Sequence, residues 1–213
     1  MNRFAGELKA EIEKGLPGTE VQWSMASSDR FVKNFPRIPE KDSLEAGVLI
    51  LLYPRNRNIY TAFIQRPDYQ GVHGGQISFP GGKKEASDAD LVSTAKRESA
   101  EEIAINPSDL EIVGILTPLY IPVSRIVVTP VVAWTNRRPA FRPDPAEVEY
   151  IIEAPLDRFL NRSIIRTGPW QVRGENLTIR YFGYDGHVIW GATAMILQEL
   201  LVIITRAGLS PRE

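Results

Sequence analysis

The sequence contains no cysteine and only two histidines, His73 and His187. The missing thiols exclude disulfides, thiolate zinc sites, iron–sulfur clusters and cysteine nucleophiles. Two histidines cannot supply a three-histidine metal site within one chain. Any chemistry that this chain performs therefore depends on other side chains.

Long apolar runs and an excess of one charge are also absent. The 25 Lys and Arg residues and the 26 Asp and Glu residues give a net charge of −1, which argues against bulk binding to nucleic acid or membranes. Charges enter the N-terminal segment MNRFAGELKAEIEKG too early for a signal peptide. Near the other end, Gln198 and Glu199 interrupt AMILQELLVIIT, which is too short to span a bilayer. We expect a soluble, cytoplasmic protein with neither nucleic acid nor membrane as a partner.

The length and composition are those of a globular protein. The 213 residues are 43% hydrophobic and 24% charged, and predict one elaborated domain or one domain with a small extension. Apolar residues at helical spacing predict an amphipathic helix over 3–15, and residues 17–43, with several prolines and no clear period, predict an extended lead-in. We therefore divide the chain into an N-terminal part, 1–43, and a main domain, 44–208.

Within the main domain, β-branched and apolar runs predict strands, and amphipathic periods predict two helices. The first two strands are close enough to form a hairpin. The expected strands cover 45–54, 59–66, 76–79, 111–121, 125–134, 163–172 and 176–184, and the expected helices cover 89–104, with Asp88 as N-cap, and 191–207. This order predicts an α/β or α+β fold with a mixed sheet between helices.

The most informative segment is the first of these helices, which carries the run Arg97-Glu98-Ser99-Ala100-Glu101-Glu102. At about 100° per residue, Glu98, Glu101 and Glu102 fall within an arc of about 100° on one helix face. Like charges at this spacing repel one another. A bound divalent cation would remove that repulsion, and carboxylate oxygens suit Mg²⁺ or Mn²⁺. The alternative is an ordinary solvated acidic face.

A tight loop, Phe79-Pro80-Gly81-Gly82, lies a short distance before the acidic helix. The glycines allow its backbone to approach a ligand or another segment closely. Backbone carbonyls beside three carboxylates would complete an oxygen cage for a metal ion. Such an ion would bind a diphosphate and activate a water molecule.

At these residues the sequence resembles the Nudix hydrolase family. The family's box reads Gly, five residues, Glu, seven residues, then Arg-Glu-apolar-any-Glu-Glu-any-Gly-apolar, and Gly82, Asp88 and Arg97-Glu98-x-x-Glu101-Glu102 occupy these places. Asp88 replaces the first Glu, eight residues separate it from Arg97, and Ala104 replaces the last Gly. Ala104 either takes a left-handed conformation, which costs about 1 kcal/mol, or ends the helix differently. We expect activity to survive this departure.

The longer box with Asp is similar to that of the coenzyme A pyrophosphatase branch of the family. The segment His73-x-Gly75-x-Ile77-x-Phe79-Pro80-Gly81-Gly82 matches the body of that branch's upstream signature, and Trp190-Gly191-Ala192-Thr193-Ala194 resembles the start of its C-terminal helix. The resemblance implies an α/β/α sandwich and a Mg²⁺- or Mn²⁺-dependent hydrolase of the diphosphate in coenzyme A or its thioesters. The products would be 3′,5′-ADP and 4′-phosphopantetheine or its acyl form.

Two other functions stay open. One is hydrolysis of another nucleoside diphosphate derivative, such as ADP-ribose or a dinucleotide. The other is a non-catalytic nucleotide sensor, against which the intact set of three glutamates argues. A homodimer is also possible.

The resemblance also implies roles for individual residues. The metal ligands would be Glu98, Glu101 and Glu102, with the backbone of Gly81 or Gly82 as a further ligand. Arg97 would pair with Asp88 and hold the loop against the helix. The implied catalytic residues are Glu101, Glu102 and Glu147, the last as a general base or a ligand of a second metal, with an ordinary loop carboxylate as the alternative for Glu147.

Substrate contacts are expected from basic residues and from the loop histidine. Coenzyme A carries a 3′-phosphate besides its diphosphate, so selectivity for it requires an additional basic residue. The candidates for substrate binding are Arg66, His73, Lys83 and Arg125. Trp134 and Trp190 are expected in the core rather than under an adenine ring.

Overall fold

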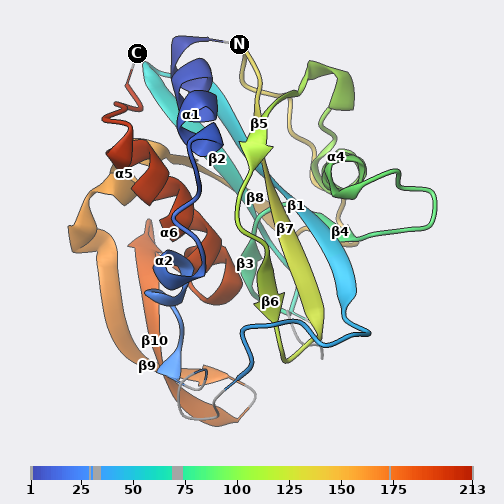
Figure 1. The fold of residues 1–213 in the computed structure, drawn as a ribbon, viewed down its shortest axis with the longest axis vertical. Coiled ribbons are helices and arrows are strands. Elements are labelled where there is room, and N and C mark those ends of the chain that lie inside the picture. Colours follow the sequence, from blue (N-terminus) through green and yellow to red (C-terminus); the bar gives the residue numbers. More distant parts are fainter. Residues whose placement is uncertain (1, 29, 31–34, 69–73, 173, 213) are drawn as a thin grey trace.

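The computed structural model describes residues 2–28, 30, 35–68, 74–172 and 174–212 (Figure 1). The main sheet contains β1 (Leu44–Arg55), β2 (Asn58–Gln65), β3 (Ile77–Ser78), β4 (Gly81–Lys83), β5 (Glu111–Ile115), β6 (Leu119–Ile121), β7 (Ile126–Trp134) and β8 (Tyr150–Pro155). A second, three-stranded sheet contains β9 (Ile165–Val172), β10 (Glu175–Tyr184) and β11 (His187–Ile189). The helices are α1 (Arg3–Glu13), α2 (Thr19–Trp23), α4 (Leu91–Ile103), α5 (Leu156–Leu160) and α6 (Gly191–Arg206), with short 3₁₀ turns at Pro107–Asp109 and Arg162–Ile164.

The main sheet is mixed, as predicted. Its central strand β1 runs parallel to β7 and antiparallel to β2 and β4. The strand order is β3-β2-β1-β7-β5, with β8 on β2 and β6 on β7. The turn between β1 and β2 consists of Asn56 and Arg57, both with positive φ (49° and 60°), which is the conformation that a two-residue hairpin requires.

Helices cover both faces of this sheet, which confirms the predicted sandwich (Figure 1). Because side chains alternate along a strand, Leu49 and Leu51 of β1 belong to the core cluster beneath α4, whereas Ile50 and Leu52 belong to the cluster that contains α1 and α6. This double burial explains why β1 is an almost continuous apolar run. Among the residues that the structure describes, no helix is long and apolar enough to cross a membrane.

Helix α4 lies unusually close to the sheet at Gly47. A Cβ atom at this position would lie 2.4 Å from the carbonyl oxygen of Leu91 and 3.0 Å from the backbone nitrogen of Ala95. Both atoms belong to the helix backbone and cannot move independently of it. Gly47 therefore determines how deeply the acidic helix sits on β1.

Three details differ from the sequence-based expectations. The predicted strand 111–121 is two strands, because Pro118 lacks an N–H group and the Thr117 N–H donates to Glu199 instead of to β7. The strands β4, β8 and β11 were not predicted. The lead-in is not wholly extended, because α2 forms within it.

Candidate active site

The glycine loop enters the sheet as β4, which pairs with β1 so that Gly81 lies opposite Val48. Gly81 has a φ of 144°, and a Cβ atom there would lie 2.3 Å from the carbonyl oxygen of Gly47. A Cβ atom on Gly82 would lie 2.3 Å from the carboxylate carbon of Glu98. Gly81 is therefore required by the close approach of the β1 backbone, whereas a side chain at Gly82 would displace the Glu98 carboxylate.

Helix α4 begins at a different residue from the one expected. Asp90, and not Asp88, is the N-cap, since its carboxylate accepts a hydrogen bond from the Ser93 N–H at 2.7 Å. The helix ends at Ala104, which is left-handed with φ 57° and donates its N–H to the Ala100 carbonyl. Ala104 thus performs the left-handed helix termination usually assigned to glycine.

Asp88 instead joins an ion-pair cluster around Arg97. The guanidinium donates from Nε and Nη2 to the two carboxylate oxygens of Asp88, at 3.0 and 2.9 Å. Its Nη2 also donates to the Lys83 carbonyl at 3.1 Å, and its Nη1 lies 3.0 Å from both Glu98 and Glu101. Hydrogen bonds from Arg97 hold the pKa of Asp88 well below its ordinary value. Arg97 therefore ties the glycine loop, the following turn and the acidic helix together.

Glu102 is the buried member of the acidic group, with 1% of its surface exposed. One carboxylate oxygen accepts a hydrogen bond from the Gly81 N–H at 2.7 Å, and the other accepts one from Arg66 at 3.2 Å. Arg66 also donates to the Gly81 carbonyl at 3.1 Å. Burial raises the pKa of Glu102 to about 7, although the positive charge of Arg66 acts in the opposite direction.

Glu98 and Glu147 complete the negative field around Glu102. Burial raises the pKa of Glu98, and the charges of Glu101 and Glu147 raise it further. Glu147 is exposed on the loop after β7, which is fastened to the end of α4 because Asp144 donates its N–H to the Glu102 carbonyl at 2.9 Å. The structure thus places Glu147, which is 45 residues away in sequence, beside the helix.

The donor chemistry of this group fits a hard divalent cation. The charge of Glu147 disfavours the charged forms of both Glu98 and Glu102, the charge of Glu98 disfavours that of Glu102 as well, and a cation would relieve this conflict. The absent side chain of Gly82 leaves room beside the Glu98 carboxylate. As placed, no three Asp, Glu or His side chains in the described part of the chain are grouped closely enough to hold an ion. Glu101, with 56% of its side chain exposed, shares Nη1 of Arg97 with Glu98.

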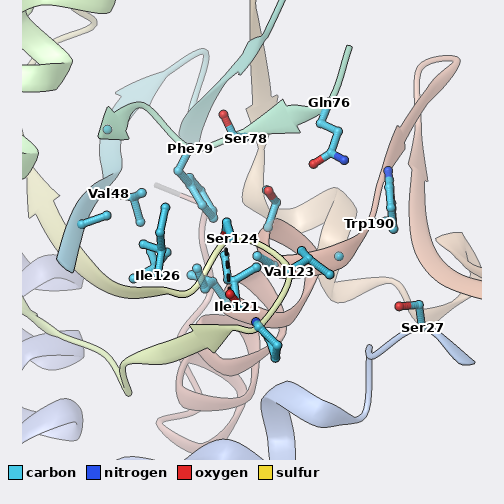
Figure 2. A pocket seen from close by; sticks show the side chains of 18 of the residues that line it. Ser27, Val48, Gln76, Ser78, Phe79, Ile121, Val123, Ser124, Ile126 and Trp190 are labelled. Carbon is cyan, nitrogen blue, oxygen red and sulfur yellow. Dashed lines mark hydrogen bonds between the residues drawn. The ribbon is translucent and has the colours of Figure 1, made fainter. Parts of the chain in front are cut away.

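A cavity of about 820 Å³ opens beside the glycine loop (Figure 2). Its wall includes the loop itself, the β6–β7 turn, the β9–β10 hairpin and the first turn of α6. Apolar side chains such as Phe79 and Ile126 cover much of it (Figure 2). Among the residues that the structure describes, four basic side chains line it against one acidic side chain: Arg30, Arg66, Lys83 and Arg125 against Glu175. The cavity is therefore locally cationic in a chain of almost zero net charge, which favours an anionic ligand.

Three of the four expected substrate-binding residues, Arg66, Lys83 and Arg125, line this cavity. His73 lies outside the described residues. Trp134 is buried as expected, with 1% exposed, whereas the expectation of a core position for Trp190 is wrong, since it is half-buried and faces the cavity (Figure 2).

Sequence reasoning missed the contribution of the lead-in. Ser27, Arg30 and Phe35 line the same cavity. Their segment has no hydrophobic period, so no local signal indicated that it would pack against the site. The one sequence feature that pointed to a binding role was a basic residue, Arg30, near an aromatic residue, Trp23. Such pairs are too common to be specific.

An acidic helix bonded to a glycine loop at the rim of a cationic cavity is typical of proteins that bind a phosphorylated ligand together with a divalent cation. The NUDIX domain model matches residues 43–159. The chain belongs to the Nudix hydrolase family.

Relatives of the chain carry the same family name. It is 35% identical over 167 residues to Nudix hydrolase 22, chloroplastic, of Arabidopsis thaliana, covering 75% of this chain and 55% of that protein. The chain thus spans about half the length of that relative. It is 33% identical over 189 residues to the uncharacterized Nudix hydrolase NudL of Salmonella dublin, covering 85% of this chain and 96% of the relative.

A solved structure supports the fold. The Nudix hydrolase from Alicyclobacillus acidocaldarius superposes with a TM-score of 0.52 at 17% identity, covering 81% of this chain and 99% of that one. At this identity the likeness establishes the fold alone.

Proposed function

We propose that this protein hydrolyses the diphosphate bond of coenzyme A or its thioesters in a reaction that requires Mg²⁺ or Mn²⁺. The products are 3′,5′-ADP and 4′-phosphopantetheine or its acyl form. The observation that carries the proposal is the placement of the glycine loop: it is bonded to the acidic helix on one side and lines the cationic cavity on the other. A diphosphate in the cavity thus meets the cation site at this loop.

Within this proposal, Glu98, Glu101 and Glu102 hold the cation together with the backbone of Gly82. To reach that position, the Glu101 side chain gives up its ion pair with Arg97 and turns toward the cation. The side chain is exposed enough to allow this rotation. The bound cation supplies Lewis-acid polarisation of the diphosphate and lowers the pKa of bound water.

The remaining residues position the substrate and move the proton. Arg66 and Lys83, which lie at the loop end of the cavity, neutralise negative charge on the diphosphate. Glu147, on the loop fastened to α4, accepts the proton of the attacking water. Arg97 and Asp88 keep the loop and the helix at a constant separation.

The substrate assignment rests on the size and charge of the cavity as well as on the box. A diphosphate uses the two basic residues near the loop, and two further basic residues, Arg30 and Arg125, lie elsewhere in the wall, where a further phosphate would bind. The largely apolar lining suits the uncharged remainder of an acyl-pantetheine chain. Residues 44–208 form the proposed Nudix unit; a cytoplasmic location and a homodimer stay predictions.

The test is turnover of a substrate panel by the purified protein. Coenzyme A, dephospho-coenzyme A, ADP-ribose and NADH are incubated separately with Mg²⁺ or Mn²⁺, and products are identified by mass spectrometry. We expect 3′,5′-ADP from coenzyme A and a rate reduction of about a hundredfold or more in Glu102→Gln. Glu7→Gln, in a helix remote from the site, is the matched control and keeps full activity.

Each other outcome contradicts a specific part. Cleavage of ADP-ribose or NADH without cleavage of coenzyme A would refute the substrate and retain the hydrolase. Binding of these compounds with no turnover of any would refute the enzyme and favour a nucleotide sensor.

A further inference from the structure

Two residues of the N-terminal segment, Ser27 and Arg30, form part of one wall of the cavity. Ser27 and Arg30 line the cavity together with residues from the glycine loop and from the start of α6. Figure 2 shows Ser27 and Val48 at opposite sides of the cavity, the first from the N-terminal segment and the second from β1. A segment that precedes the box by some 50 residues therefore contributes directly to the binding surface.

This segment is fastened to the body of the protein by a buried carboxylate. Glu199 of α6 has no exposed surface and accepts hydrogen bonds from the Gly18 N–H at 3.0 Å and from the Gln22 side chain at 2.9 Å. It accepts two more from the Thr117 N–H and hydroxyl. Burying a carboxylate is unfavourable unless several donors compensate, and here the four donors come from two separate parts of the chain, residues 18–22 and Thr117. Residues 18–22 are thus held against α6, and farther along the segment the Ser28 hydroxyl accepts a hydrogen bond from the Thr178 N–H at 3.0 Å.

Arg30 is the most buried of the four basic residues in the cavity wall, with 8% of its surface exposed. Its Nη1 donates to the Tyr120 carbonyl at 3.4 Å, and its guanidinium carbon lies 5.5 Å from the centre of the Trp23 ring. Both contacts restrict its rotamers. A guanidinium that is oriented in advance and shielded from water interacts strongly with a phosphate group.

The other basic residues are less suited to recognise a second anionic group. Arg66 is bonded to Glu102 and to the glycine loop, next to the proposed cleavage site. Lys83 belongs to that loop. Arg125 has 56% of its side chain exposed, so water and salt screen its charge.

We propose that Arg30 is a specificity-determining residue that contacts an anionic group of the substrate outside the scissile diphosphate, and that Glu199 is the positioning residue for its segment. This inference rests on the proposed function, because it takes the 3′-phosphate of coenzyme A as that group. It assigns substrate selectivity to a part of the chain outside the region that the family model matches.

The test compares ligands with and without the 3′-phosphate. Binding of 3′,5′-ADP and of 5′-AMP is measured by calorimetry without metal, so that no turnover is needed. We expect the wild-type protein to bind 3′,5′-ADP at least tenfold more tightly than 5′-AMP. In Arg30→Met, which keeps the apolar stem, this ratio falls to nearly one, and Arg30→Lys restores only part of it.

The matched control is Arg37→Met. Arg37 also stacks on Trp23, at 4.2 Å from the ring centre, and forms an ion pair with Glu20, but it does not line the cavity. Its replacement removes the same charge from the same N-terminal part of the chain, and we expect the tenfold ratio to persist. An unchanged ratio in Arg30→Met, an equal loss in Arg37→Met, or a wild-type protein without the preference would each overturn the assignment of Arg30.

The role of Glu199 is tested by kinetics with coenzyme A. In Glu199→Gln we expect KM to rise about tenfold while kcat changes less than threefold, because the wall moves and the cation site does not. Gln22→Met, which removes one donor from the network, is the milder second variant and shows the same split to a smaller extent. A fall in kcat at constant KM in both would overturn the positioning role.

The two proposals fail separately. A protein that cleaves no coenzyme A yet shows the Arg30-dependent preference for 3′,5′-ADP would refute the proposed reaction and retain the inference. A protein that cleaves coenzyme A with a preference independent of Arg30 would do the reverse.

Discussion

Replacing Ala104 with glycine tests how the acidic helix ends. Ala104 is exposed and left-handed, with φ 57°, and a residue with a Cβ atom pays about 1–2 kcal/mol for this conformation. Glycine removes that strain but adds about 0.4–1 kcal/mol of conformational entropy to the unfolded chain. The net effect is a stabilisation of about 0.5–1 kcal/mol, since the substitution removes no buried side chain. The N–H bond to the Ala100 carbonyl is kept.

The assay is urea-induced unfolding, supported by thermal unfolding. For a chain of this length the gain corresponds to an increase in Tm of about 1–4 °C. Ala100→Gly is the matched control, because this residue lies in the helix interior, where glycine lowers stability by about 1 kcal/mol. If Ala104→Gly also lowers the unfolding free energy, the left-handed end does not exist in solution and the reasoning is refuted.

Three further predictions concern the site. Gly82→Ala places a Cβ atom on the Glu98 carboxylate, which lies at the end of a flexible side chain; we expect activity to fall at least tenfold while Tm changes by less than about 3 °C. Without metal, Glu102 is protonated more readily in the folded than in the unfolded state. Its contribution to the free energy of unfolding therefore decreases by up to about 3 kcal/mol as pH rises from about 4.5 to about 7. Glu102→Gln removes this pH dependence, which is measured by urea titrations. The paired Asp88 has the opposite sign: its stabilisation is present above its unfolded pKa and is lost as pH falls through the lowered folded pKa, so Arg97→Met should reduce the acid sensitivity of unfolding.

Each of these predictions has a contrary result. Full activity in Gly82→Ala would show that the Glu98 carboxylate has no required position. An unchanged pH dependence in Glu102→Gln would show that this carboxylate titrates normally. Equal acid sensitivity with and without Arg97 would show that its ion pair with Asp88 is not formed in solution.

Local features explain what was predictable. The acidic face of α4 follows from residue spacing alone, because the helix places side chains three and four positions apart on one side. The β1–β2 hairpin follows from two apolar runs separated by a short polar turn. The left-handed Ala104 was one of two foreseen ends of the helix, and the structure selects it.

Competition between similar residues accounts for one error. Asp88 and Asp90 both precede the helix, and either is a chemically suitable N-cap. The choice is made by Arg97, which binds both oxygens of Asp88 from the second turn of the helix. That interaction spans nine residues and is not visible in a capping pattern.

Tertiary contacts account for the rest. The hydrogen bonds from Gly18 and Gln22 to Glu199 join residues more than 170 positions apart. No periodicity in the lead-in predicts these hydrogen bonds. The wall that Arg30 forms could therefore be found only in three dimensions. The short strand β8 was overlooked for a similar reason: its own sequence is a weak strand signal, and its pairing with β2 becomes visible only in the structure.

Gly47 bears no functional group, yet it limits how closely α4 can approach the sheet. Because α4 packs directly on Gly47, this contact determines how far each carboxylate of the helix lies from the sheet. A side chain at this position would push the helix away from β1 and would move both Glu98 and Glu102 away from the glycine loop. The geometry of the proposed site thus depends on a backbone contact beneath the helix, next to the glycine loop. A search for variants with altered activity should therefore include Gly47, although it carries no reactive group.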